Sequence, residues 1–306
     1  MGPLLLFIAA TLWGSAFVAQ KLGGNHLGPF AMTFLRNIIA AVFLYGCFRL
    51  RLRFFGRAGI PEGAKRSFSR RAFFGGLMCG AALFLASLAQ QIGIAYTTPG
   101  VSAFLTTNYM LLIPVFGIFV GRVARPVVWI WVVCAIIGSY FICISADSEG
   151  VSLGRGEAWT LLCAALFAVQ VLCVDRFAPG TDVVAFSCVQ QLAGALFGLP
   201  FIFMASERAY YTSEHLTAAI WPLLYVGILS SGIAYTCQNL GQVRTPPALA
   251  AIIMSLESAI GAICGYLILG DVLTPRQFVG CTIMFATVLL SQVHQYLPKL
   301  SRIGRS

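Results

Sequence analysis

The sequence predicts an all-α polytopic membrane protein with ten transmembrane helices, arranged as two inverted five-helix repeats. Of its 306 residues, 59% are hydrophobic and only 10% are charged, whereas a soluble domain carries about a quarter charged residues. The mean hydropathy is +0.87. Apolar runs of about 18 residues or more, the length that crosses a bilayer as a helix, recur along the whole chain.

Ten such runs follow one another with short connections between them. Turn-forming residues mark several connections, such as "TTPG" at Thr97–Gly100 and "LTP" at Leu273–Pro275. The first run has no basic segment before it and is longer than the core of a cleaved signal peptide, so we expect it to remain as a span. The expected spans are 3–20, 29–48, 72–95, 100–121, 127–145, 156–174, 183–204, 217–240, 247–269 and 275–294.

The basic residues indicate an orientation in the membrane. With the N-terminus inside, the cytoplasmic segments hold fifteen Lys and Arg residues and the outside segments hold four. This bias follows the positive-inside rule and predicts that both termini are cytoplasmic. Because these residues lie in connections between spans, the net charge of +10 reflects topology and attraction to anionic lipid, and we expect no nucleic-acid partner.

The cysteines and histidines do not form a metal site. The ten cysteines lie within or at the ends of the expected spans, no two form a CxxC pair, and the three histidines lie in connections or at a helix end. This distribution is typical of cysteines used as small packing residues. We therefore predict no metal, no other cofactor and no disulfide framework.

The two halves of the chain resemble each other. "QQIGIAYTTPGVSAFL" from Gln90 aligns without a gap on "QNLGQVRTPPALAAII" from Gln238, and "IAATLWGSAFVAQKL" from Ile8 resembles "CAALFAVQVLCVDRF" from Cys163. Each half holds five expected spans, an odd number, so the second half enters the membrane from the opposite side. The predicted organisation is a first repeat over 1–146, a second over 154–295, and a short basic cytoplasmic tail over 296–306.

Five stretches in this order resemble the EamA family of the drug/metabolite transporter superfamily. They are "TLWGSAFVAQKLG", "GPFAMTFLRNIIAA", "GVSAFLTTNYMLLIPVFGIFVGR", "LLCAALFAVQVLCVDRF" and "GIAYTCQNLGQVRTPPALAAIIMSLESAIGAICGYLILGD". The resemblance covers nearly the whole chain. It implies a central cavity between two inverted repeats, and export or exchange of small metabolites such as amino acids. Where the family usually has Leu-Glu-Pro, this chain has Ser258 in place of the proline.

Other function classes fit the residues less well. A membrane enzyme needs a reactive constellation within the spans, but the acids other than Glu257 lie in connections or near span ends, so we predict no catalytic residue. A channel is expected to show rings of like charge or repeated filter residues. The predicted function is a secondary transporter in a bacterial inner membrane with a small-molecule substrate; the sequence leaves the energy coupling open between proton antiport, exchange and facilitated transport. A flippase for a lipid-linked substrate is the alternative, and the sequence assigns no oligomeric state.

Polar and aromatic side chains within the spans are the candidate substrate-binding residues. Polar side chains at this depth face the protein interior or a wet cavity, and those of the eighth span recur on one helix face. Amides, hydroxyls and aromatic rings suit a neutral or zwitterionic solute, although hydrogen bonds between helices account for any one of them equally well. The candidates are Trp13, Gln90, Asn108, Tyr109, Gln170, Tyr235 and Gln238.

Two charged residues, Arg36 and Glu257, lie inside expected spans. A charged side chain near mid-span costs about 2.5–3.5 kcal/mol on insertion scales, so Glu257 must be protonated, paired or hydrated. One interpretation pairs it with Arg36 as part of the architecture. The other makes Glu257 a proton-linked switch of the transport cycle, because burial opposes the charged form of a carboxyl group. The sequence leaves both interpretations open.

Overall fold

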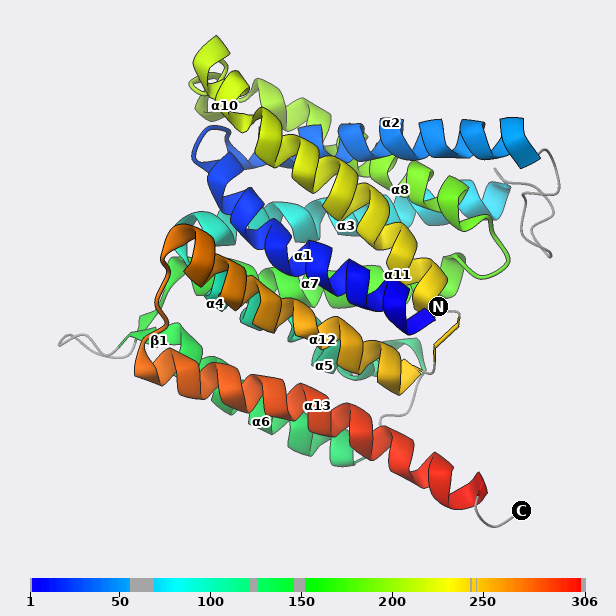
Figure 1. Cartoon of the computed structure of the whole chain (residues 1–306), viewed down its shortest axis with the longest axis vertical. Coiled ribbons are helices and arrows are strands. Elements are labelled where there is room, and N and C mark those ends of the chain that lie inside the picture. Colours follow the sequence, from blue (N-terminus) through cyan, green and yellow to red (C-terminus); the bar gives the residue numbers. More distant parts are fainter. Residues whose placement is uncertain are drawn as a thin grey trace.

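Helices cover each of the five spans expected in the first half of the chain (Figure 1). The structure is a computed structural model that describes residues 2–55, 69–121, 126–145, 152–242, 244–245 and 247–303. The fourth span is broken, because the helix over its first part ends at Thr106 and another begins at Tyr109. The elements are α1 (Gly2–Gly24), α2 (Pro29–Phe55), α3 (Arg70–Tyr96), α4 (Pro99–Thr106), α5 (Tyr109–Gly117), the 3-10 helix η2 (Ile118–Val120) and α6 (Val127–Cys143).

The second half is likewise helical, and two of its spans contain π-helical turns. The π-helix η4 (Tyr225–Ala234) lies in the middle of the eighth expected span, and η5 (Gly265–Leu269) ends the ninth. The other elements are α7 (Arg155–Phe177), α8 (Val183–Gly198), the 3-10 helix η3 (Leu199–Phe203), α9 (Ala205–Arg208), α10 (Ser213–Leu224), α11 (Tyr235–Gln242), α12 (Pro247–Cys264) and α13 (Pro275–Ile303).

A short antiparallel contact departs from the expected all-helical class. Strand β1 (Ile144–Ser145) pairs with β2 (Ser152–Leu153), so that Ile144 faces Leu153. The fifth span therefore stops being helical at Cys143, two residues before the predicted end. Beyond the helix end, the backbone groups have no partners within the helix. The pairing of β1 with β2 supplies such partners.

Seven helical segments in the described part of the chain are long and apolar enough to cross a membrane. Three further apolar helices are shorter, Trp129–Ile142, Ile253–Leu269 and Pro275–Leu290. The architecture is that of a polytopic membrane protein. The number of ten spans and the inverted repeat remain predictions.

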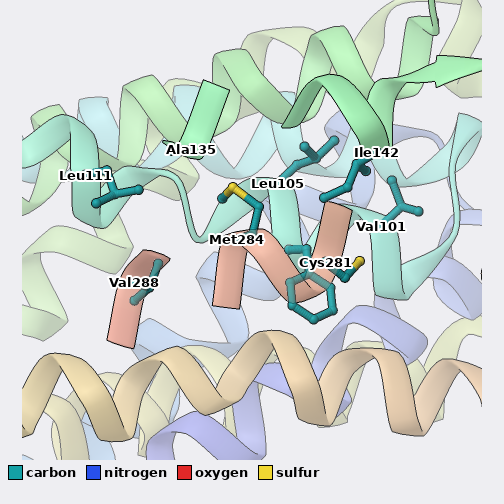
Figure 2. Packing of buried hydrophobic residues seen from close by; sticks show 9 residues of the cluster. Val101, Leu105, Leu111, Ala135, Ile142, Cys281, Met284 and Val288 are labelled. Carbon is teal, nitrogen blue, oxygen red and sulfur yellow. The ribbon is translucent and has the colours of Figure 1, made fainter. Parts of the chain in front are cut away.

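The two halves of the chain interleave. The most extensive helix contacts all join a helix of the first half to one of the second: α3 with α7 and α8, α1 with α12, α2 with α8, and α6 with α13. Figure 1 shows α13 lying along α6 at one edge of the bundle. Figure 2 shows part of the apolar core at this edge, where Leu105 and Ile142 lie close to Cys281 and Met284. Any cavity at the centre is therefore bounded by both halves.

Glycines let some of these helices approach closely. A Cβ atom added to Gly14 of α1 would lie 2.7 Å from the backbone oxygen of Glu257 and 2.7 Å from Cβ of Ile260, both on α12. Small residues at helix contacts are typical of membrane bundles, because close backbone approach maximises van der Waals packing. The backbone of α1 therefore lies directly against the helix turn that carries Glu257.

Acidic side chains occupy both ends of the packed pair α2 and α8. At the start of α2, the buried carboxylate of Glu207 accepts hydrogen bonds from the backbone N–H groups of Phe30 (3.4 Å) and Ala31 (2.9 Å). At the other end, Asp182 accepts from the first amides of α8 and forms an ion pair with Arg51 of α2. Each carboxylate satisfies N–H groups that have no partner within their own helix.

We expect the stability of the protein to depend on pH through Glu207. Burial raises the pKa of Glu207, although its hydrogen bonds from Ala31 and Phe30 oppose the shift. Because the folded pKa exceeds the unfolded one, the folded state binds more protons between them. Stability is therefore greatest below the ordinary carboxyl pKa and falls as pH rises through the raised value. Glu207→Gln keeps an acceptor oxygen and should flatten this slope, whereas Glu207→Ala should lower stability by about 1 kcal/mol.

The unfolding midpoint of the purified protein in detergent is measured between about pH 4.5 and about pH 8, the range in which buried carboxyl groups titrate. Glu214→Gln serves as the control, because Glu214 is exposed on the first turn of α10. An undiminished pH slope in Glu207→Gln would show that another group is responsible.

Candidate functional site

A central cavity lies between helices of both halves. It contains about 550 Å³ of space between atoms, its open mouth included. Its lining comes from α1, α2, α3, α4, α5, α7, η4, α11 and α12. The lining residues are Trp13, Phe17, Gln20, Arg36, Gln90, Thr106, Tyr109, Phe167, Gln170, Val171, Ser230, Tyr235, Gln238 and Glu257.

Most candidate residues from the sequence lie on this cavity. Trp13, Gln90, Tyr109, Gln170, Tyr235 and Gln238 line it together with both intramembrane charges, Arg36 and Glu257. Asn108 is the exception, because it is not among the described residues that line the cavity, and its role toward a substrate stays a prediction. Its Nδ2 donates to the backbone oxygen of Leu105 (2.9 Å) and to Oγ of Ser139 on α6 (3.2 Å). Asn108 therefore links the break between α4 and α5 to a neighbouring helix.

Five lining residues were not expected from the sequence, namely Phe17, Gln20, Phe167, Val171 and Ser230, whereas Thr106 belongs to the polar run of the fourth span. Helical spacing could have found two of them, because Phe17 and Gln20 follow Trp13 by four and seven residues and so share its face of α1. Phe167 likewise precedes Gln170 by three residues. Polarity alone does not select the apolar members of such a face.

Aromatic rings form much of the cavity wall. The rings of Trp13 and Tyr235 meet edge to face with centroids 4.8 Å apart, and those of Tyr109 and Phe167 lie 6.4 Å apart. The indole Nε1 of Trp13 donates to the backbone oxygen of Ser230 (3.0 Å). This oxygen lies in the π-helix η4, where backbone hydrogen bonds join residues five apart instead of four. The wider turn lets side chains reach carbonyl groups. The aromatic wall is thus fixed to the backbone.

Arg36 is held in place by hydrogen bonds that it donates to residues of two other helices. Arg36 is buried, with only 4% of the residue's surface exposed. Its Nε donates to Oγ of Ser231 (3.2 Å) and its Nη1 donates to Oε1 of Gln20 (3.2 Å). The amides of Gln191 and Gln91 in turn donate to the backbone oxygens of Ser231 (3.2 Å) and Gln20 (3.0 Å). The guanidinium therefore has a defined orientation on the cavity wall.

Glu257 lies on the same cavity and is also only 4% exposed. The ion pair found among the described residues joins Arg51 to Asp182; Arg36 and Glu257 do not form one with each other. Nor does any described residue donate a side-chain or backbone hydrogen bond to the Glu257 carboxylate. The structure thus gives no support to a direct structural pair, and it places a guanidinium and a separate carboxyl group on one cavity.

The described part of the chain brings together no group of three or more His, Cys, Asp or Glu side chains able to hold a metal ion. Nine cysteines within it are free thiols. What the cavity offers to a ligand is therefore a set of amides and hydroxyls, aromatic faces, one guanidinium and one carboxyl group.

A bundle of apolar helices around a central cavity of mixed polarity defines the class of membrane transporters. The chain belongs to the EamA-like transporter family, within the drug/metabolite transporter superfamily, because the family model matches residues 1–144 and again residues 154–292. It is an integral membrane protein and a transporter of small metabolites rather than an enzyme.

Relatives are similar over most of their length. The threonine/homoserine exporter RhtA of Escherichia coli K12 is 29% identical over 90% of this chain and 86% of its own. An uncharacterized transporter of Archaeoglobus fulgidus is 25% identical over 93% and 83%, and the uncharacterized transporter YetK of Bacillus subtilis is 25% identical over 97% and 89%. A crystal structure aligned over 95% of this chain and 96% of its own has a TM-score of 0.63 at 17% identity, which shows a shared fold.

Proposed function

We propose that this protein is a secondary transporter that exports or exchanges amino-acid-like or other neutral and zwitterionic solutes by alternating access. The observation that carries the proposal is the single central cavity with one guanidinium, one carboxyl group and neutral amides on its wall. A solute without net charge but with polar ends matches such a lining. The similarity to a threonine/homoserine exporter supports the same class of solute.

The proposed mechanism needs two half-bundles that expose the cavity to each side in turn. Two repeats over 1–146 and 154–295, related by an axis in the membrane plane, supply that symmetry. The repeat-related residues Gln90 and Gln238 both line the cavity, as expected for a site on such an axis.

The proposed setting is a bacterial inner membrane, with ten spans and with both termini in the cytoplasm. The charge asymmetry of the connections supports this orientation. Reporter fusions after Arg53 and after Ser148 test it: the first should be cytoplasmic and the second external. The same compartment for both would contradict the inverted arrangement.

Transport by the purified protein in liposomes tests the proposed function. The panel consists of radiolabelled amino acids and the corresponding amines, and protein-free liposomes serve as the control. Accumulation of at least one amino acid above the control is expected. If no member of the panel moves while a fluorescent lipid-linked sugar changes leaflet, the protein is a flippase and the proposal is wrong.

A further inference from the structure

We infer that Arg36 is the carboxylate-binding residue of the central cavity, so that a bound zwitterion is oriented with its carboxylate on α2 and its ammonium group toward α12. This inference rests on the transport function proposed above and adds a specific role for one residue and a polarity for the substrate. Its basis is the burial of Arg36, the fixed orientation of its guanidinium and the charge balance of the cavity.

The guanidinium of Arg36 has N–H donors left over for a ligand. Arginine has five N–H donors in a planar fork. Two of them donate to Ser231 and Gln20, and no other described residue accepts from the rest. The second hydrogen on Nη1 and both hydrogens on Nη2 remain, and one from each nitrogen can donate to the two oxygens of a carboxylate.

The buried charge of Arg36 also needs a counter-ion. A buried charge without a counter-ion is unfavourable unless a ligand or water supplies one. Arg36 forms no ion pair with any described residue, and it lines the central cavity. A carboxylate of the substrate would supply both the missing charge and the missing acceptors.

The charged groups of the cavity wall suit a zwitterion better than an anion. Among the described residues of the cavity wall, Arg36 is the only cationic side chain, and Glu257 lies on the same wall without an ion pair to any of them. A phosphate or dicarboxylate would bring more negative charge than one guanidinium balances and would meet Glu257 as a like charge. A zwitterion places one charge opposite each residue, and the rings of Trp13, Tyr109 and Tyr235 are left for the rest of the solute.

The test compares ligands that differ only in the carboxylate. The probes are L-threonine and L-phenylalanine, their C-terminal amides, and 1-amino-2-propanol and phenethylamine, which lack the carboxyl group. Equilibrium binding to the purified full-length protein and uptake into liposomes are both measured. Wild type should prefer at least one free amino acid over its amide by about tenfold or more, as expected for hydrogen bonds to a charged group.

Arg36→Gln should bring that ratio to about one, and Arg36→Lys should lower it severalfold because an ammonium group lacks the planar fork. A role of Arg36 in folding alone would weaken amino acid and amide equally, so the ratio separates the two roles. Arg71→Gln is the control, because Arg71 is exposed at the start of α3, and it should keep the wild-type ratio. If Arg36→Gln is not recovered as folded protein, the lysine variant decides.

An unchanged ratio in the Arg36 variants would overturn the inference, as would failure of wild type to bind either amino acid. Wild-type binding with an Arg36-dependent carboxylate preference but without uptake would instead support the binding role and contradict the transport function. The two proposals therefore fail separately.

Discussion

Glu257→Gln is expected to abolish proton-driven accumulation of substrate while leaving a folded protein that still exchanges it, bound through Arg36 but with a weaker affinity because the ammonium group loses its acidic partner. Glutamine has the shape of a protonated glutamate and cannot ionise. Glu257 forms no ion pair with a described residue, so the neutral side chain should lose no structural bond. An unpaired ionised carboxylate is costly at this depth, which makes proton binding and release at Glu257 a means of favouring one state of the cycle over the other.

The expected size of the effect follows from the driving force. A pH difference of one unit is worth about 1.4 kcal/mol per proton, enough for about tenfold accumulation if one proton is exchanged per substrate. Wild type in liposomes with an acidic lumen should approach that ratio, whereas Glu257→Gln should reach a ratio of about one. Exchange of labelled for unlabelled substrate without a pH difference should persist in both.

Glu157→Gln is the matched control. Glu157 accepts a hydrogen bond from Oγ1 of Thr97 (2.7 Å) at the start of α7 and is not among the residues that line the cavity. It should therefore keep gradient-driven accumulation. Full accumulation by Glu257→Gln would rule out the coupling role, and loss of folded protein would assign Glu257 to the architecture.

The second large effect is expected from Gly14→Leu, which should prevent α1 from packing on α12. Even a Cβ atom at this position would lie 2.7 Å from a backbone oxygen of α12, and a backbone atom cannot move aside as a flexible side chain can. Overpacking of this kind typically costs about 1–3 kcal/mol. Gly14→Ala should fall in that range, and Gly14→Leu should exceed it and remove most transport.

The control uses a glycine in open surroundings. Gly46 of α2 has no atom within 4 Å of an added Cβ, so Gly46→Ala and Gly46→Leu test the general effect of replacing a helical glycine, which favours the helix by about 1 kcal/mol. The recovery of monodisperse protein and the unfolding midpoint in detergent are compared for the four variants. Equal behaviour at the two positions would contradict the importance of the α1–α12 contact.

The positions of the helices could be predicted because an apolar run of bilayer length has few alternatives to a helix. Local breaks could not be predicted in the same way. Nothing in the composition around Tyr225 indicates a π-helix. Two of its carbonyl groups, those of Ser230 and Ser231, accept hydrogen bonds from side chains of α1 and α8, and such contacts between distant segments are not visible in the local sequence. The break at Asn108 is also set by a neighbour, Ser139 of α6.

The candidate site was predictable where a pattern on one helix, or a match between the halves, pointed to it. Gln90 and Gln238 were found through their alignment, and Tyr235 through the polar face of its helix. Gln20 was missed, since its role depends on its contact with Arg36 of another helix. Asn108 is not among the residues that line the cavity: its polarity indicates a buried hydrogen-bond partner but does not tell whether that partner is a solute or the hydroxyl of Ser139.

The interleaving of the halves also bears on how the chain is assembled during its synthesis. Helices made early have their most extensive contacts with helices made late: α1 with α12, α2 with α8, α3 with α7. Contacts between residues far apart in the sequence form slowly and only after both partners exist. While the ribosome is still translating, the early helices must wait in lipid with Arg36 lacking its partner Ser231. We therefore expect the nascent chain to gain most of its helix contacts only after its last helices are inserted.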